Sequence, residues 1–117
     1  MSLDPVRVVI VPEGADADSA TSRQIMLDLL LDTETGASKG PFPAFGRIGD
    51  FRRPETLYPF TLMIDGRVDL GAHANDAQRQ HRLEVRDAQL KEGTCMALDD
   101  GETRTPFVIQ SVTRLAP

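Results

Sequence analysis

Cys95, His73 and His81 carry the side chains best suited to covalent chemistry in this sequence. A cysteine and a histidine from distant positions can meet in a fold as a nucleophile and its base. Cys95, however, stands in the apolar run Thr94–Leu98, where a strand cysteine usually packs as a small apolar side chain. No oxyanion or acid–base group accompanies it in the sequence. We therefore expect no catalytic residue.

The same histidines are poor metal ligands. They lie eight positions apart in a polar stretch and lack the cysteines, glutamates or third histidine of a zinc site. Asp16 and Asp18 begin like a calcium loop, but Thr21 stands where that loop needs glycine and Leu27 where it needs glutamate. The sequence predicts no metal site and no cofactor.

Cations and aromatic rings interleave in one segment. Guanidinium groups fork onto carboxylates and phosphates, and aromatic rings stack on bases or fill pockets of a partner. The structural alternative is that Arg52 and Arg53 pair with Asp50 and Glu55 on an exposed turn. The candidate binding residues are Lys39, Phe42, Phe45, Arg47, Arg52, Arg53 and Tyr58.

The composition and net charge of the chain indicate what kind of domain positions these residues. Its 117 residues, 40% hydrophobic and 26% charged, predict one globular domain over residues 1–117. A net charge of -5 argues against DNA and anionic membranes, and limits any RNA contact to a local patch. The single cysteine rules out an internal disulfide and suggests the cytoplasm. No apolar run approaches the ~20 residues of a membrane helix.

Short apolar runs separated by turn residues predict an all-β domain, a small closed or partly open antiparallel barrel. The dipeptides Asp65-Gly66 and Asp100-Gly101 mark hairpin turns. Residues 72–80 are polar and could hold one short helical turn. The expected strands are Val6–Val11, Phe60–Asp65, Arg67–Leu70, Arg82–Arg86 with Leu83 and Val85 inward, Thr94–Leu98 and Phe107–Leu115.

Residues 21–32 fit two structures. Thr21 and Gln24 could form a capping box that opens a helix, which would make the fold α+β. Read with a period of two, the segment is instead a strand whose one face is lined by Ile25, Leu27, Leu29 and Leu31. Periodicity alone does not decide between the helix and the strand. The segment that follows, residues 35–59, is too rich in glycine and proline for a long helix. Its aromatic residues must dock on the barrel or on a partner.

Two stretches resemble the C-terminal β-barrel of elongation factor Tu. Leu90–Gly101 follows the pattern Leu-x-Glu-Gly-Thr-x-Phe-Ala-Ile-x-x-Gly of that family's closing hairpin. Glu34–Phe42, with Arg47 and Phe51 after it, resembles the family's segment from an acidic glycine turn into an aromatic and arginine-bearing strand. The resemblance spans about residues 25–115. It implies that Ile25–Thr33 is a strand and that Val6–Val11 is an addition to the barrel.

The departures from that family bear on function. Ser38 stands where the family has an arginine that approaches transfer RNA, although Lys39 restores a charge next to it. Asp99 and Asp100 make the closing turn acidic, and no nucleotide-binding loop is present. We therefore expect a non-catalytic binding module for a protein partner. The alternatives are an RNA-contacting accessory domain of translation, which uses Lys39 and Arg47, and an enzyme of unknown class that uses Cys95, His73 or His81.

Overall fold

The computed structural model of the chain describes residues 3–13, 24–38, 44–51, 53–70, 81–86, 88–99, 101 and 103–115. This part contains eight strands and one 3₁₀ turn, Pro54–Thr56. The strands are β1 (Leu3–Pro12), β2 (Gln24–Asp32), β3 (Ala44–Gly49), β4 (Tyr58–Leu62), β5 (Arg67–Asp69), β6 (His81–Leu83), β7 (Cys95–Asp99) and β8 (Arg104–Arg114).

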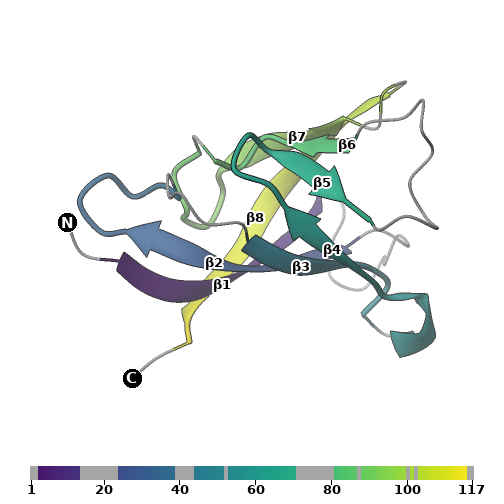
Figure 1. Cartoon of the computed structure of the whole chain (residues 1–117), viewed down its shortest axis with the longest axis horizontal. Helices are drawn as coiled ribbons and strands as arrows, with labels where there is room; N and C mark the ends of the chain where they lie inside the picture. Colours follow the sequence, from purple (N-terminus) through teal and green to yellow (C-terminus); the bar gives the residue numbers. More distant parts are fainter. Residues whose placement is uncertain are drawn as a thin grey trace.

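The strands form a closed antiparallel barrel (Figure 1). Each strand pairs with the next one in the chain, and β8 returns to pair with β1. The prediction of an all-β antiparallel barrel is confirmed, in its closed form. Among the described residues, no helix is long and apolar enough to cross a membrane. The expected helical turn in residues 72–80 lies outside the described residues.

Strand β2 decides between the two structures that fitted residues 21–32. Residues 24–32 are a strand between β1 and β3, so the helix prediction is wrong. Ile25, Leu27 and Leu29 are buried, and Leu31 packs against the core beside them. Only a period of two places all four on the inner face of the barrel, and tertiary packing therefore overrides the capping signal.

We had expected Val6–Val11 to be an addition to the barrel, but β1 is one of the strands of the barrel itself. Eight of its residues pair with β2, from Leu3 with Asp32 to Ile10 with Ile25. Its other edge pairs with β8, from Val6 with Arg114 to Pro12 with Phe107. Because β1 lies between β2 and β8, it is the strand that closes the barrel.

Two further hairpins have their turns at the Asp-Gly dipeptides that the sequence predicts as turns. Gly66, with φ of 94°, stands in the turn between β4 and β5, and Gly101, with φ of 95°, stands between β7 and β8. Such values favour glycine. Leu83 and Val85 are buried, as the alternation predicted. The ladders around β5 and β6 are short: β4 with β5, β5 with β6, and β6 with β7 are each joined by two residue pairs.

Apolar side chains fill the described interior. Barrels of eight strands leave an inside just wide enough for side chains to fill. The core is built by Val6, Val8, Ile10, Ile25, Leu27, Leu29, Ala44, Phe60, Leu62, Leu83, Val85, Leu90, Met96, Leu98, Phe107 and Ile109.

Gly46 on β3 allows a close approach between strands and an aromatic ring of this core. It is paired with Phe60 of β4, and the Phe60 ring lies directly over it. A Cβ at position 46 would come within 2.6 Å of Phe60 Cζ and 2.7 Å of the Met26 carbonyl oxygen. The absent side chain therefore lets β2, β3 and the Phe60 ring pack together.

We predict that Gly46→Ala lowers the free energy of unfolding by about 1–3 kcal/mol, because the added methyl group overpacks a site bounded by backbone. Urea unfolding at neutral pH measures the change. Phe45→Ala, one residue away on the outer face, is the matched control and should change stability by less than about 0.5 kcal/mol. Equal stability of Gly46→Ala and the native protein would show that the contact is not tight.

Candidate functional site

Strand β3 holds two of the predicted binding residues, Phe45 and Arg47. Side chains of a strand alternate between its faces, so Gly46 and Ile48 face the barrel interior while Phe45 and Arg47 face outward. Phe45 is 63% exposed. A phenyl ring this exposed on a regular strand contributes little to folding and is available to a partner.

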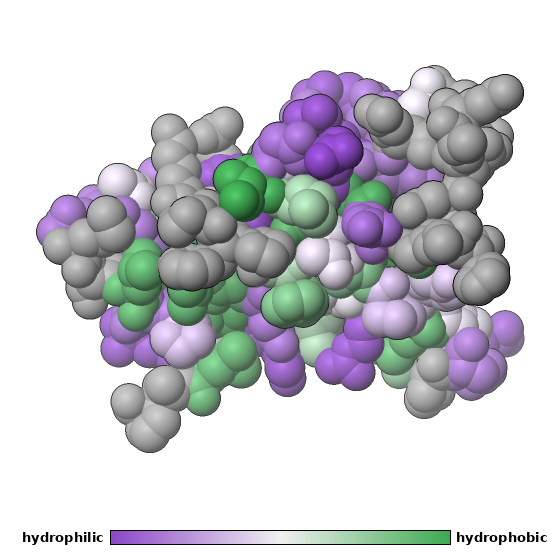
Figure 2. Space-filling model, viewed as in Figure 1, coloured by the Kyte–Doolittle hydropathy of each residue, from purple (hydrophilic) through white to green (hydrophobic). Residues whose placement is uncertain are grey.

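Tyr58 begins β4 and lies beside β3, where it pairs with Ile48. It is 42% exposed. In Figure 2, apolar and near-neutral residues gather on the middle of the face on which Figure 1 shows β3 and β4. A groove of about 410 Å³ lies here, lined by Phe45, Gly46, Tyr58, Pro59, Phe60, Thr61, Asp69 and Leu70.

Arg47 extends along the outer face towards β2 rather than remaining free in solvent. Its Nη2 lies 3.6 Å from Met26 Sδ on the paired strand. Two residues along β2, Asp28 accepts two hydrogen bonds from Arg7, at 2.8 Å from Nε and 3.0 Å from Nη2. Three charged side chains therefore form a row across β1, β2 and β3, with the carboxylate in the middle.

This row sets the ionisation of Asp28. The hydrogen bonds from Arg7 hold the pKa of the Asp28 carboxyl below its ordinary value, and the charges of Arg7 and Arg47 act in the same direction. Partial burial opposes them. The side chains of Arg7 and Asp28 are both 39% exposed, so solvent screens the pair and its stabilisation is modest.

Arg53 belongs to the connection between β3 and β4. The Thr56 hydroxyl organises this connection, because it accepts a hydrogen bond from Asp50 N at 3.0 Å and lies 2.8 Å from the Arg53 carbonyl oxygen. Arg53 itself is exposed. Among the described residues, the structure shows no ion pair between Arg53 and Asp50 or Glu55.

The remaining predicted binding residues, Lys39, Phe42 and Arg52, lie outside the described residues. Phe45 and Tyr58 both line this groove. Arg47 shares the outer face of β3 with Phe45, whereas Tyr58 lies opposite Ile48 on the other side of the sheet. Arg53 lies in the adjoining connection between the two strands.

Cys95 differs from our expectation of a packing residue. It is exposed, at the start of β7, because Met96 and Leu98 take the inward positions. It is also far from His81. The register pairs Arg82 with Asp99, which is four residues from Cys95 and about 13 Å along β7. His81 precedes Arg82 on β6 and lies farther still from Cys95. His73 lies outside the described residues.

Arg86 was missed by the sequence reading, which placed it at the end of an alternating strand. Its side chain is instead buried, with 9% of its surface exposed. Nη1 donates to Ser38 Oγ at 3.1 Å, Nη2 to the Leu62 carbonyl at 3.2 Å, and Nε to the Met63 carbonyl at 3.3 Å. Burial lowers the pKa of the Arg86 guanidinium. Arg86 therefore fastens the loop after β2 to the end of β4.

No signal in the sequence distinguishes Arg86 from the exposed arginines around it, because its burial depends on a loop 48 residues earlier. Ser38, the loop residue that it binds, is only 1% exposed. Among the described residues, no group of three or more histidine, cysteine, aspartate or glutamate side chains could hold a metal ion.

Comparison with family models, with curated proteins and with solved structures finds no match for this chain. No activity or ligand therefore carries over from a relative. The function proposed for the chain rests on the outer face of β3 and β4 and on the charges around it.

We predict that Asp28→Asn lowers the free energy of unfolding at pH 7 by at most about 1 kcal/mol. Because the folded-state pKa of Asp28 is lowered, its contribution is complete above the ordinary carboxyl pKa of about 4 and is lost as the pH falls through the folded-state value. Urea unfolding at pH 7 and below about pH 3 should therefore show a difference that shrinks in acid. A difference independent of pH would contradict this ion-pair account.

Proposed function

We propose that this chain is a non-catalytic, protein-binding module of the cytoplasm, resembling the C-terminal barrel of elongation factor Tu. The face formed by β3 and β4 binds a partner segment that carries apolar and acidic side chains. The single cysteine fits the reducing conditions of that compartment.

The observation that carries the proposal is the pair of exposed aromatic rings at one groove. Phe45 and Tyr58 both line it, and both are held by the β3–β4 ladder rather than by a mobile loop. Rigid aromatic side chains supply large contact areas at low entropic cost, and they are frequent among the residues that dominate binding energy. An apolar side chain of the partner packs against the exposed Phe45 ring, with Tyr58 at the edge of the same groove.

Charges near the groove favour an acidic partner. Arg47 follows Phe45 by two positions on the same outer face, and Arg53 is exposed in the connection to β4. Guanidinium groups recognise carboxylates through paired hydrogen bonds. The partner segment therefore combines at least one large apolar residue with nearby Asp or Glu.

The alternative of an RNA-contacting domain has weaker support. Ser38, at the position where the resembling family places an arginine, is buried and hydrogen-bonded to Arg86. It offers no surface to a phosphate backbone. The net charge of -5 opposes RNA as well.

We predict that a library of random twelve-residue peptides displayed on phage is enriched by this protein in sequences that combine an aromatic or large aliphatic residue with Asp or Glu. Phe45→Ser should weaken the binding of an enriched synthetic peptide about tenfold or more, because it removes the ring at the centre of the groove. Arg47→Gln should weaken it less and reduce its salt dependence. Fluorescence anisotropy with the labelled peptide gives the affinities.

Arg114→Gln is the matched control, because Arg114 is an exposed arginine at the far end of β8 that pairs with Asp4. It should leave peptide affinity unchanged. The proposal fails if no common sequence is enriched, or if Phe45→Ser and Arg114→Gln bind the peptide equally well. Binding of transfer RNA that weakens steeply with salt would favour the RNA-contacting domain instead.

A further inference from the structure

Arg47 reaches from β3 to a methionine on β2. Met26 is directly opposite Arg47 in the β2–β3 register, and on its other side it is opposite Val9 of β1. Arg47 Nη2 lies 3.6 Å from Met26 Sδ, on the exposed surface of the sheet. A thioether sulfur is a weak hydrogen-bond acceptor, so this contact guides the guanidinium over β2 without holding it firmly.

The carboxylate beside Met26 is already engaged. Asp28 follows Met26 by two positions on the same face of β2, and its Oδ1 and Oδ2 accept hydrogen bonds from Arg7 at 2.8 and 3.0 Å. The charge of Arg47 helps to lower the pKa of Asp28, in keeping with a guanidinium that lies near this part of β2. Within the described residues, Met26 is the only hydrogen-bond acceptor of the Arg47 side chain.

Met26 is open to small oxidants. It is partly exposed, as Met63 is, whereas Met96 is buried with 7% of its surface exposed. A peroxide oxidises an accessible thioether to a sulfoxide, which is polar and is returned to the thioether by sulfoxide reductases. The sulfur lone pair attacks one oxygen of hydrogen peroxide, and an S–O bond forms as the O–O bond breaks. The leaving hydroxide takes the proton of the transferred oxygen and becomes water.

Oxidation changes the acceptor that β2 offers to Arg47. A polar sulfoxide oxygen replaces a weakly accepting sulfur, and a hydrogen bond from a charged donor is roughly twice as strong as a neutral one. The flexible end of the methionine side chain lets this oxygen turn towards Arg47 Nη2, which already lies 3.6 Å from Sδ. The guanidinium is then held against β2, with its donors turned away from a partner.

We propose that Met26 is an oxidation-sensitive modification site that controls the availability of Arg47. With Met26 as the thioether, the guanidinium is available to an acidic group; with Met26 as the sulfoxide, it is bound to β2. The effect on a partner rests on the function proposed above, in which Arg47 meets an Asp or Glu of the partner. The change at Arg47 itself does not depend on that function.

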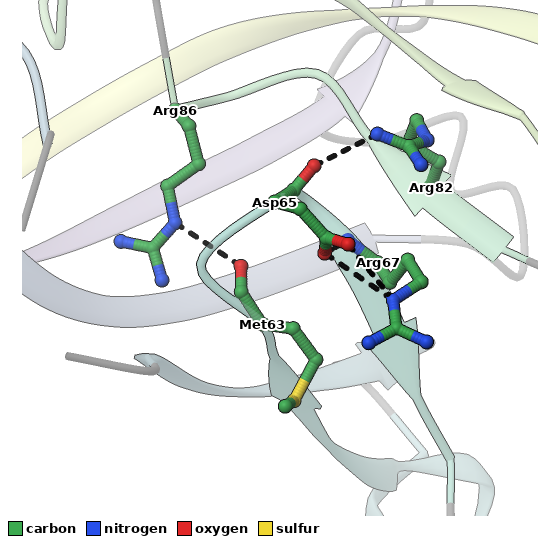
Figure 3. A network of polar contacts seen from close by, with 5 residues as sticks. All are labelled: Met63, Asp65, Arg67, Arg82 and Arg86. Atoms are coloured by element: carbon green, nitrogen blue, oxygen red, sulfur yellow. Dashed lines mark hydrogen bonds and ion pairs between the residues drawn. The ribbon is translucent and has the colours of Figure 1, made fainter. Parts of the chain in front are cut away.

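Met63 is the matched control for this chemistry. It is also partly exposed and follows β4 directly. Arg47 is opposite Pro59, four residues before Met63. The Met63 carbonyl oxygen accepts a hydrogen bond from Arg86 Nε at 3.3 Å, and in Figure 3 the Met63 sulfur points away from that guanidinium. Oxidation of Met63 therefore adds a sulfoxide to the protein without giving Arg47 a new acceptor.

The first test treats the full chain with dilute hydrogen peroxide and follows the Nε–H signal of Arg47 by NMR, while peptide mass spectrometry measures the sulfoxide at each methionine. We expect the Arg47 signal to shift in proportion to the oxidation of Met26, in the native protein and in Met63→Leu, and to stay unchanged in Met26→Leu. The proposal is overturned if Met26 oxidises and the Arg47 signal does not move, or if Met63 oxidises under conditions that leave Met26 intact.

The second test measures the affinity for the acidic, apolar peptide that the reduced protein selects. Oxidation should weaken its binding by about the factor that Arg47→Gln produces, and should weaken binding to Arg47→Gln no further. Equal weakening in both proteins would contradict control through Arg47, because it would show a loss of apolar contact at Met26 itself. If no peptide is selected at all, the proposed function fails, and the NMR measurement alone decides whether Met26 controls Arg47.

Discussion

The barrel depends on the antiparallel pairing of β1 with its two neighbours. Eight residue pairs join β1 to β2 and seven join it to β8, whereas the ladders around β5 and β6 have two pairs each. Val6, Val8 and Ile10 from this strand are fully buried at the centre of the core. Because β1 joins the first and last parts of the sheet, every other strand takes its position from this closure.

The candidate binding residues Phe45 and Tyr58 lie on β3 and β4, neither of which pairs with β1. Strands β3 and β4 are held rigidly enough to keep Phe45 and Tyr58 at one groove. One rule, the alternation of side chains along a strand, produces both the apolar interior and these outer faces.

Much of the barrel could be predicted from period-two patterns and turn residues, as for β1, the β4–β5 hairpin and the inward Leu83 and Val85. Periodicity alone left residues 24–32 undecided because the leucines fit a helix equally well. The resemblance to the elongation factor Tu barrel implied a strand, and pairing on both edges shows it. The burial of Arg86 and the exposure of Cys95 could not be predicted, since both depend on contacts or positions that residue type does not encode. Phe45 and Tyr58 were identified as candidates, but their shared groove required the β3–β4 register.

Amide hydrogen exchange followed by NMR tests the closure by β1 most directly. The account predicts that the amides of Val8, Ile10 and Leu27 exchange only through global unfolding, at the free energy measured by urea, while those of β5 and β6 exchange through smaller local openings. The contrary result is rapid exchange along β1 while β2, β7 and β8 stay protected. It would mean that the barrel persists without β1 and that this strand is peripheral.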